Sequence, residues 1–224
     1  MNDLNKLRHQ LANVARRLAA ERKSTLDDLK ASERHLERPD FLWHFLLQSF
    51  GTMGRAVGWA GLSKPENYRR VTYEALAELP PRERRVAAEQ AFRDAKVRMP
   101  SIKAGYLTGC FDRIAQLGGP QAAKDRLLRL PGRDAKIKFL KSLPGIGDKY
   151  ARNILMDVYH PEFRDSIAVD ARIKSLSQSL DLTFPTYQQH EEFYLEVARE
   201  AGLNGWELDR LIFNFLGEFV PATR

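Results

Sequence analysis

One stretch of the sequence combines residue types that can hold an anion beside a reactive amine. Residues 139–154 read FLKSLPGIGDKYARNI, with apolar residues at helical spacing on both sides of Pro144-Gly145-Ile146-Gly147. We expect one helix to end near Leu143 and another to begin near Asp148. The glycines permit backbone angles closed to other residues, and Ile146 plugs the junction of the two helices. Amides at such a helix start can bind an anion, which the helix dipole also favours.

Lys149 lies in the first turn of the second helix. A free lysine amine has a pKa of about 10.4, so it is mostly protonated at neutral pH and cannot attack an electrophile. Partial burial and a helix N-terminus both disfavour the ammonium, so this position favours a nucleophilic amine. The simpler interpretation is a basic side chain that touches a phosphate.

Asp170 follows Lys149 by 21 positions, in the stretch AVDARI. It stands just before a helical pattern, where aspartate is a favoured N-cap residue. A carboxylate there could also stabilise positive charge in a transition state and assist proton transfer. Capping and catalysis are both compatible with this position.

The elements that would position these residues all read as helices. FLWHFLLQSF (41–50) is apolar nearly all round and predicts a buried helix, whereas residues 22–40 are polar. Alternating strand-like stretches are absent, so the predicted fold class is all-α. The helical patterns are an amphipathic first helix with Leu4, Leu7, Leu11, Val14 and Leu18, then segments 83–97, 102–117, 124–130, 134–143 and 207–219, separated by Pro80-Pro81, Pro100, Gly118-Gly119-Pro120 and Pro131-Gly132.

Composition excludes several classes of protein. Cys110 is the only cysteine, so neither an intrachain disulfide nor a cysteine-ligated zinc or iron–sulfur centre can form. The start MNDLNKLRHQ lacks an apolar signal core, and no apolar run approaches ~18 residues. We therefore expect a soluble intracellular protein.

Charge is unevenly distributed along the 224 residues, whose formal net charge is +7. Residues 96–152 carry 13 basic and 4 acidic side chains, whereas residues 161–224 carry 6 basic and 11 acidic ones. This asymmetry fits either a solvated charged surface or a face that binds a polyanion.

The pattern Leu-Pro-Gly-Ile-Gly-x-Lys-x-Ala followed by AVDARI resembles the helix-hairpin-helix superfamily of DNA glycosylases, which includes endonuclease III and 8-oxoguanine DNA glycosylase. Upstream, FLWHFLLQSF is similar to the helix that delivers a residue into the minor groove, and MPSIKAGYLTGCFDRI to the helix that precedes the hairpin. The resemblance covers roughly residues 41–180. It implies a two-lobed helical glycosylase fold. The central lobe spans 40–160 with the hairpin at about 134–159, and a second lobe is formed by 1–39 and 161–224.

The same resemblance implies roles for particular residues. Lys149 and Asp170 are the expected catalytic pair, facing each other across the cleft between the lobes. The lysine amine attacks the sugar C1′, expels the damaged base and leaves a Schiff base that can undergo β-elimination. Gln48 either fills the gap left by an extruded base, as the resemblance implies, or is an ordinary polar residue of a buried helix. The expected DNA-binding residues are Gly145, Ile146, Gly147, Gln48, Lys103, Arg152 and Arg172. Phe213 and Phe215 are expected to pack in the core, with a place at the lesion pocket as the alternative.

These expectations describe a base-excision repair enzyme that acts as a monomer on double-stranded DNA containing a damaged base. It would be cytoplasmic and nucleoid-associated, or lie in another soluble compartment that contains DNA, with no membrane partner. No cofactor is required; a monovalent cation, K⁺ or Na⁺, is possible at the hairpin, with no iron–sulfur cluster and no other metal site. The excised base stays open among oxidised purines, oxidised pyrimidines and other modified bases, with 8-oxoguanine preferred.

Two alternatives stay open. A non-catalytic helix-hairpin-helix DNA-binding module would explain the glycines and the positive charge, but not the pairing of Lys149 with Asp170. A monofunctional glycosylase that uses activated water would need Asp170 and make Lys149 incidental.

Overall fold

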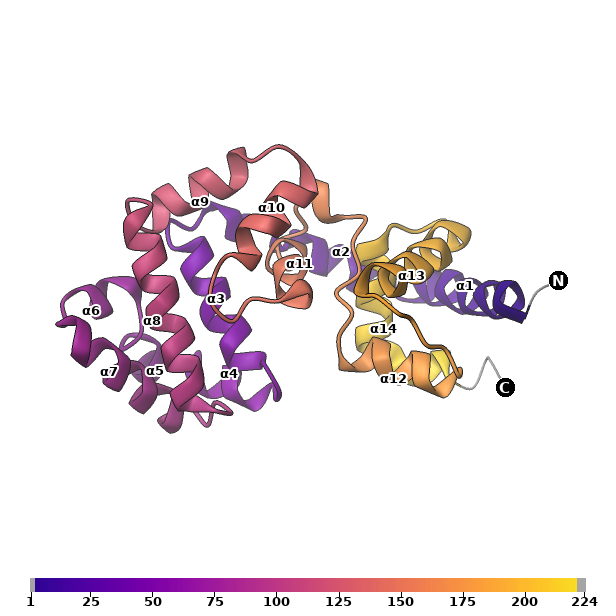
Figure 1. Cartoon of the computed structure of the whole chain (residues 1–224). Coiled ribbons are helices and arrows are strands. Elements are labelled where there is room, and N and C mark those ends of the chain that lie inside the picture. The colour runs from indigo at the N-terminus through magenta and orange to yellow at the C-terminus, as the bar shows by residue number, and fades with distance from the viewer. Residues whose placement is uncertain (1–2, 221–224) are drawn as a thin grey trace. The chain divides into compact units, whose positions relative to one another are not determined.

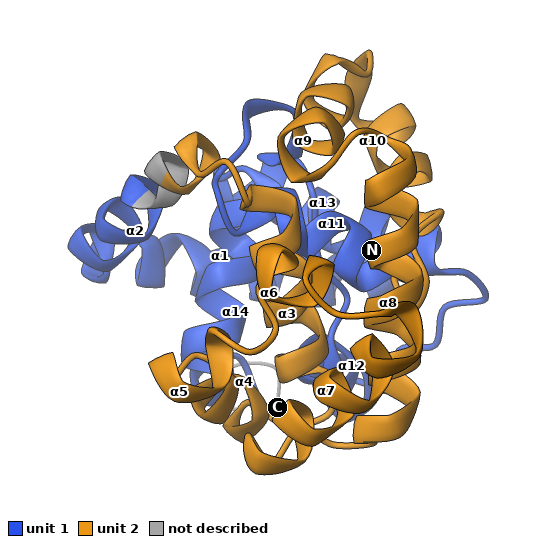
Figure 2. Ribbon diagram, turned by 90° about the vertical axis from the view of Figure 1, so that its left-hand side faces the viewer, with its two compact units in different colours: residues 1–34, 148–224 blue, residues 35–147 orange. Residues whose placement is uncertain are grey.

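The computed structural model describes residues 3–220, with the side chains of residues 4–31 and 35–220. Every regular element in this part of the chain is a helix, so the all-α prediction is confirmed. The contacts divide the chain into two compact units (Figure 2). Unit 1 comprises residues 1–34 and 148–224, and unit 2 comprises residues 35–147.

Unit 2 is built around α3, the helix predicted to be buried. Its apolar side chains surround the helix axis, and α3 packs against α4, α8 and α9, while α7 packs along α8 (Figure 1). Trp43 is completely buried, and its indole Nε1 donates a hydrogen bond to Val71 O at 2.9 Å. The helices of unit 2 are α3 (Phe41–Thr52), α4 (Val57–Leu62), α5 (Pro65–Tyr68), α6 (Tyr73–Ala77), α7 (Pro81–Asp94), α8 (Pro100–Gln116), α9 (Pro120–Arg129) and α10 (Gly132–Lys141).

Prolines mark the helix starts of unit 2, as the sequence pattern predicts. Pro81, Pro100 and Pro120 are the first residues of α7, α8 and α9. A proline is favoured there because its missing N–H would have no partner within the helix and its fixed φ already suits a helix.

Unit 1 brings the two ends of the chain together. Helix α1 packs against α13 and α14, and α12 and α13 pack against α14 (Figure 1). Leu11, Val14 and Leu18 form the buried face of α1, whereas Leu4 is 44% exposed. Its elements are α1 (Asp3–Glu21), α2 (Lys23–Lys30), α11 (Asp148–Met156), the short 3₁₀ helix η2 (Pro161–Phe163), α12 (Ala171–Ser179), α13 (Tyr187–Ala201) and α14 (Gly205–Phe219), and the 3₁₀ helix η1 (Ala31–Glu37) leads to unit 2.

Two features differ from the sequence pattern. Residues 22–40 are described from the sequence only as polar, yet they contain α2, whose Leu26 is buried. The domain boundary predicted near residue 160 falls at 147/148, because α11 is bonded to other parts of unit 1. Arg152 Nε donates to Glu191 Oε2, and Trp206 Nε1 donates to Met156 O. The hairpin is therefore divided, with α10 in unit 2 and α11 in unit 1.

The burial of Trp43 generates a stability prediction. Trp43→Phe should lower the free energy of unfolding by about 2–3 kcal/mol, because it leaves Val71 O unpaired and opens a cavity in the core. Urea denaturation would measure this loss. Trp59→Phe is the matched control: Trp59 is half-buried, so its loss should be smaller. Equal losses at both positions would contradict the central role of α3.

Candidate active site

The hairpin turn has the predicted boundaries. Helix α10 ends at Lys141, and α11 begins at Asp148. Gly145 has φ +80°, a conformation that L-residues rarely adopt. A Cβ on Gly145 would lie 2.5 Å from Tyr106 Cδ2 and 3.0 Å from Phe50 Cε1. This glycine is therefore required both by its backbone angle and by the close approach of two aromatic rings.

The other two hairpin residues differ from expectation. Gly147 does not have a positive φ, so the prediction that it permits an unusual backbone angle is wrong. It is exposed, and a Cβ there would meet no described atom within 4 Å. Ile146 is buried, and its amide already donates to Leu143 O at 3.1 Å. Ile146 thus serves the turn itself, and its expected contact with DNA stays a prediction.

Lys149 is half-buried in the first turn of α11. Desolvation lowers the pKa of its amine, and the nearby carboxylates of Asp157, Asp170 and Asp209 partly oppose this shift. Its Nζ lies 4.0 Å from the centroid of the Tyr150 ring. Burial dominates, so a larger fraction of the amine is neutral than in a free lysine.

Asp170 is the N-cap of α12. Its Oδ1 accepts hydrogen bonds from Arg172 N at 2.8 Å and Ile173 N at 3.0 Å, so the capping interpretation is confirmed. None of the hydrogen bonds recorded between described residues uses Oδ2. Capping thus fixes the carboxylate through one of its two oxygens. Lys149 and Asp170 both lie in unit 1, not in opposite lobes as the resemblance implies.

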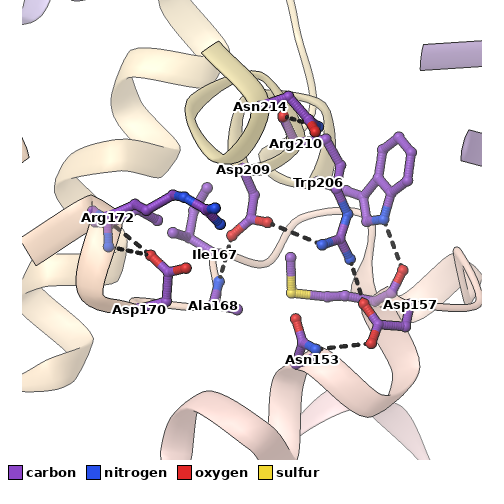
Figure 3. A network of polar contacts seen from close by, with 12 residues as sticks. Asn153, Asp157, Ile167, Ala168, Asp170, Arg172, Trp206, Asp209, Arg210 and Asn214 are labelled. Carbon is purple, nitrogen blue, oxygen red and sulfur yellow. Dashed lines mark hydrogen bonds and ion pairs between the residues drawn. The ribbon is translucent and has the colours of Figure 1, made fainter. Parts of the chain in front are cut away.

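Helix α14 supplies a network of polar contacts that the sequence analysis misses (Figure 3). Asp209 is buried and accepts a hydrogen bond from Ala168 N at 2.9 Å. Burial raises the pKa of Asp209 to about 6. Arg210 Nη1 lies 3.6 Å from Asp209 Oδ2, and its Nη2 lies 2.8 Å from Asp157 Oδ1. Asn153 Nδ2 also donates to Asp157, at 2.8 Å. The network thus joins α14 to the Lys149 helix and to the segment before Asp170.

A sequence signal for Asp209 does exist. It stands three positions after Trp206 and three before Ile212, both buried, so it occupies the apolar face of an amphipathic helix. A charged residue at such a position needs a buried partner.

Two basic residues expected to bind DNA lie in the interior instead. Lys103 is fully buried, and its Nζ donates to Phe50 O at 2.8 Å and Met53 O at 2.7 Å. It therefore satisfies carbonyls at the C-terminal end of α3, and desolvation lowers its pKa to about 8. Arg152 is buried and pairs with Glu191 at 2.7 Å. Their charges are used in packing, which corrects both predictions.

Arg172 and Phe213 form an exposed pair next to Asp170. The Arg172 guanidinium carbon lies 3.7 Å from the centroid of the Phe213 ring. Phe213 is 44% exposed, so its predicted place in the core is wrong, whereas Phe215 is half-buried. Because the Phe213 ring and the planar Arg172 guanidinium are both accessible, they form a surface that suits a flat ligand.

Gln48, the residue expected beside an extruded base, is half-buried on α3.

No group of three or more histidine, cysteine, aspartate or glutamate residues in the described part of the chain could hold a metal ion. Among the same residues, no helix is long and apolar enough to span a membrane.

An all-helical fold with a glycine turn before a half-buried lysine is the arrangement that the sequence resemblance implies. No protein-family model matches the sequence, and no curated protein matches it significantly. Solved structures do match: the 8-oxoguanine DNA glycosylase of Thermotoga maritima has a TM-score of 0.68 at 16% identity, covering 93% of this chain and 97% of that one.

Two structures of the 8-oxoguanine DNA glycosylase of Methanocaldococcus jannaschii each match with a TM-score of 0.66. One is 18% identical, covering 92% of this chain and 93% of that one. The other, a glycosylase/lyase in complex with DNA containing 8-oxoguanine, is 19% identical, with 92% and 97% covered. The chain therefore has the fold of these 8-oxoguanine DNA glycosylases, as the resemblance predicts.

The contrast between the two hairpin glycines is testable. Gly145→Ala should lower the free energy of unfolding by about 2 kcal/mol or more, because alanine is strained at positive φ and its methyl group would meet Tyr106. Gly147→Ala should change it by less than about 0.5 kcal/mol. Chemical denaturation measures the free energy of unfolding of both variants. A large loss of stability in the Gly147 variant would contradict the open space beside this residue.

Proposed function

We propose that this protein is a base-excision DNA glycosylase that removes 8-oxoguanine and cleaves the resulting site through a Schiff base on Lys149. The observation that carries the proposal is the environment of Lys149. Its amine is half-buried in the first turn after the hairpin, desolvation lowers its pKa, and the carboxylate of Asp170 lies in the same unit. A neutral amine is the form that attack requires.

The comparisons support the choice of substrate class. The neighbours in fold are 8-oxoguanine DNA glycosylases, and one of them, described as a glycosylase/lyase, was solved with DNA containing 8-oxoguanine. Two features of this chain suit a nucleic acid. The exposed Gly147 permits close approach of a phosphodiester to the hairpin, and the Arg172–Phe213 pair offers a flat surface to a base.

In the proposed reaction, the neutral amine of Lys149 attacks the sugar C1′. The bond from C1′ to the base breaks, and its electron pair leaves with the base, which takes up a proton. The attached nitrogen loses one proton, the C1′–O4′ bond of the sugar ring breaks, and O4′ takes up a proton. The electron pair of the nitrogen forms the double bond to C1′, which gives the protonated Schiff base. Removal of a C2′ proton then expels the 3′-phosphate by β-elimination. The Asp170 carboxylate stabilises the positive charge that develops on the sugar.

Borohydride trapping tests the nucleophile. The wild-type protein should form a covalent adduct with a duplex containing 8-oxoguanine, because borohydride reduces a Schiff base to a stable amine. Lys149→Gln should abolish the adduct and strand cleavage while duplex binding stays close to normal. Asp170→Asn should lower the single-turnover rate of base release by about 100-fold or more. Gel electrophoresis of labelled duplex measures each product.

Controls separate the alternatives. Lys6→Gln removes an exposed lysine on α1 and should trap normally. A duplex with a preformed abasic site isolates the lyase step from base release. Base release without trapping would indicate a monofunctional glycosylase. Binding with neither reaction on a panel of oxidised bases would leave only a DNA-binding module and overturn the proposal.

The lowered pKa of Lys149 predicts the pH dependence. Because the neutral amine is reactive, the single-turnover rate should rise with pH and level off above the lowered pKa, with a midpoint below the ~10.4 of a free lysine. Asp157→Asn removes a charge that favours the ammonium, so its midpoint should move to lower pH. Rates measured from pH 6 to 10 report both midpoints. An unmoved midpoint in this variant would show that the network does not act on the amine.

A further inference from the structure

The segment directly before Asp170 has an unusual set of hydrogen bonds. Ile167, Ala168 and Val169 lie outside any helix and are at most 3% exposed. Buried amides outside regular structure need partners, because an unpaired one destabilises the fold. Here the N–H groups of these three consecutive residues each donate to a side chain of α13 or α14. Ile167 N donates to Glu191 Oε1 at 3.2 Å, Ala168 N to Asp209 Oδ1 at 2.9 Å, and Val169 N to the Tyr187 hydroxyl at 2.9 Å.

Tyr187 holds this segment at two points. Its hydroxyl accepts from Val169 N and donates to Ile167 O at 3.1 Å, so it bridges two peptide groups across Ala168. Burial raises the pKa of Tyr187, so the hydroxyl stays neutral and keeps the proton that it donates. Because Val169 is bonded directly to Asp170, this bridge fixes the backbone from which the Asp170 carboxylate projects.

The same tyrosine is linked to the helix that carries Lys149. The Arg152 guanidinium carbon lies 4.3 Å from the centroid of the Tyr187 ring, and Arg152 Nε donates to Glu191 Oε2 at 2.8 Å. Arg152 lies three positions after Lys149, in the next turn of α11. Arg152 belongs to α11, and its partner Glu191 accepts the hydrogen bond from Ile167 N. This buried pair therefore connects α11 to the segment before Asp170.

We propose that Tyr187 is a positioning residue for Asp170, which it holds at a fixed place relative to Lys149 through the Ile167–Val169 segment. The inference rests on the proposed function, since it assigns Tyr187 a part in the same reaction. The hydroxyl bridge restricts where the carboxylate sits when the sugar reacts. A displacement of about 1 Å at such a group can slow a reaction by about 100-fold.

The test substitution is Tyr187→Phe, which removes the hydroxyl and keeps the ring that Arg152 covers. Tyr194→Phe is the matched control. Tyr194 is a buried tyrosine of the same helix. Its hydroxyl lies 2.9 Å from Ser177 Oγ and takes no part in the hydrogen bonds described for residues 167–170. The Tyr187 variant should lose about 10- to 100-fold in single-turnover base release with unchanged affinity for a duplex containing an abasic-site analogue. The Tyr194 variant should keep the wild-type rate, and equal losses in both would overturn the proposal.

A double-mutant cycle decides whether Tyr187 acts through Asp170. In the Asp170→Asn background, Tyr187→Phe should change the rate by less than about twofold, because the carboxylate that it positions is already gone. A full additional loss would show that Tyr187 acts independently of Asp170. A merely structural role would not produce this non-additivity.

Amide hydrogen exchange provides a readout that does not need activity. Exchange at Val169 should accelerate in Tyr187→Phe and stay unchanged in Tyr194→Phe; equal protection in both would overturn the bridge. If the wild-type protein releases no base from any duplex, the proposed function fails. Amide exchange at Val169 then still shows whether the Tyr187 hydroxyl bridge exists. If Asp170→Asn removes activity and Tyr187→Phe does not, only the positioning inference fails.

Discussion

The polar contacts of unit 1 depend on how the half-buried amine of Lys149 is held near three carboxylates. Desolvation disfavours the Lys149 ammonium, and Asp157, Asp170 and Asp209 favour it. Those carboxylates would themselves be costly to bury without partners. The structure meets this requirement with the Arg210 guanidinium, which lies close to both Asp157 and Asp209, and with backbone amides at Ala168 and in the first turn of α12. The amine can therefore stay weakly basic because the surrounding negative charge is already bound elsewhere.

Helix α14 is the element that makes this possible. Trp206 donates its indole N–H to Met156 O at 2.7 Å, which attaches α14 to the last turn of α11. One turn later, Asp209 binds the segment before Asp170 and Arg210 binds Asp157. The capping box at Asn204 and Glu207 fixes where the helix starts and so sets the register of these contacts. Removing one partner of a buried ion pair typically lowers the stability of a fold by about 3–5 kcal/mol. The residues that attach α14 to the rest of unit 1 are therefore the same ones that set the electrostatic environment of Lys149.

Periodicity and turn chemistry were sufficient to predict the buried helix α3, the proline-marked helices of unit 2, the hairpin boundaries and the cap at Asp170, because each depends on residues close in sequence. The wrong or missing residue predictions share one cause. Lys103 and Arg152 read as surface charges, but tertiary contacts place them against the α3 carbonyls and Glu191. Tyr187 was missed because its role depends on α13 packing against a segment about 20 residues earlier in the chain. No local pattern encodes such pairings, although a charge on an apolar helix face, as at Asp209, does indicate that one must exist.

The charge asymmetry of the sequence also has a structural explanation. Residues 161–224 hold 11 acidic side chains against 6 basic ones, which would suggest that this part repels a polyanion. Much of that acidity is directed inward or neutralised. Glu191 pairs with Arg152, Asp209 lies beside Arg210, and Glu196 and Glu200 both pair with Arg8 of α1. A carboxylate in a close pair contributes less to the field at a distance than its formal charge implies. Formal net charge is therefore a poor guide to the field around unit 1. In the proposed function, the exposed guanidinium of Arg172 beside Asp170 is the positive charge of this segment that we expect a phosphate to meet.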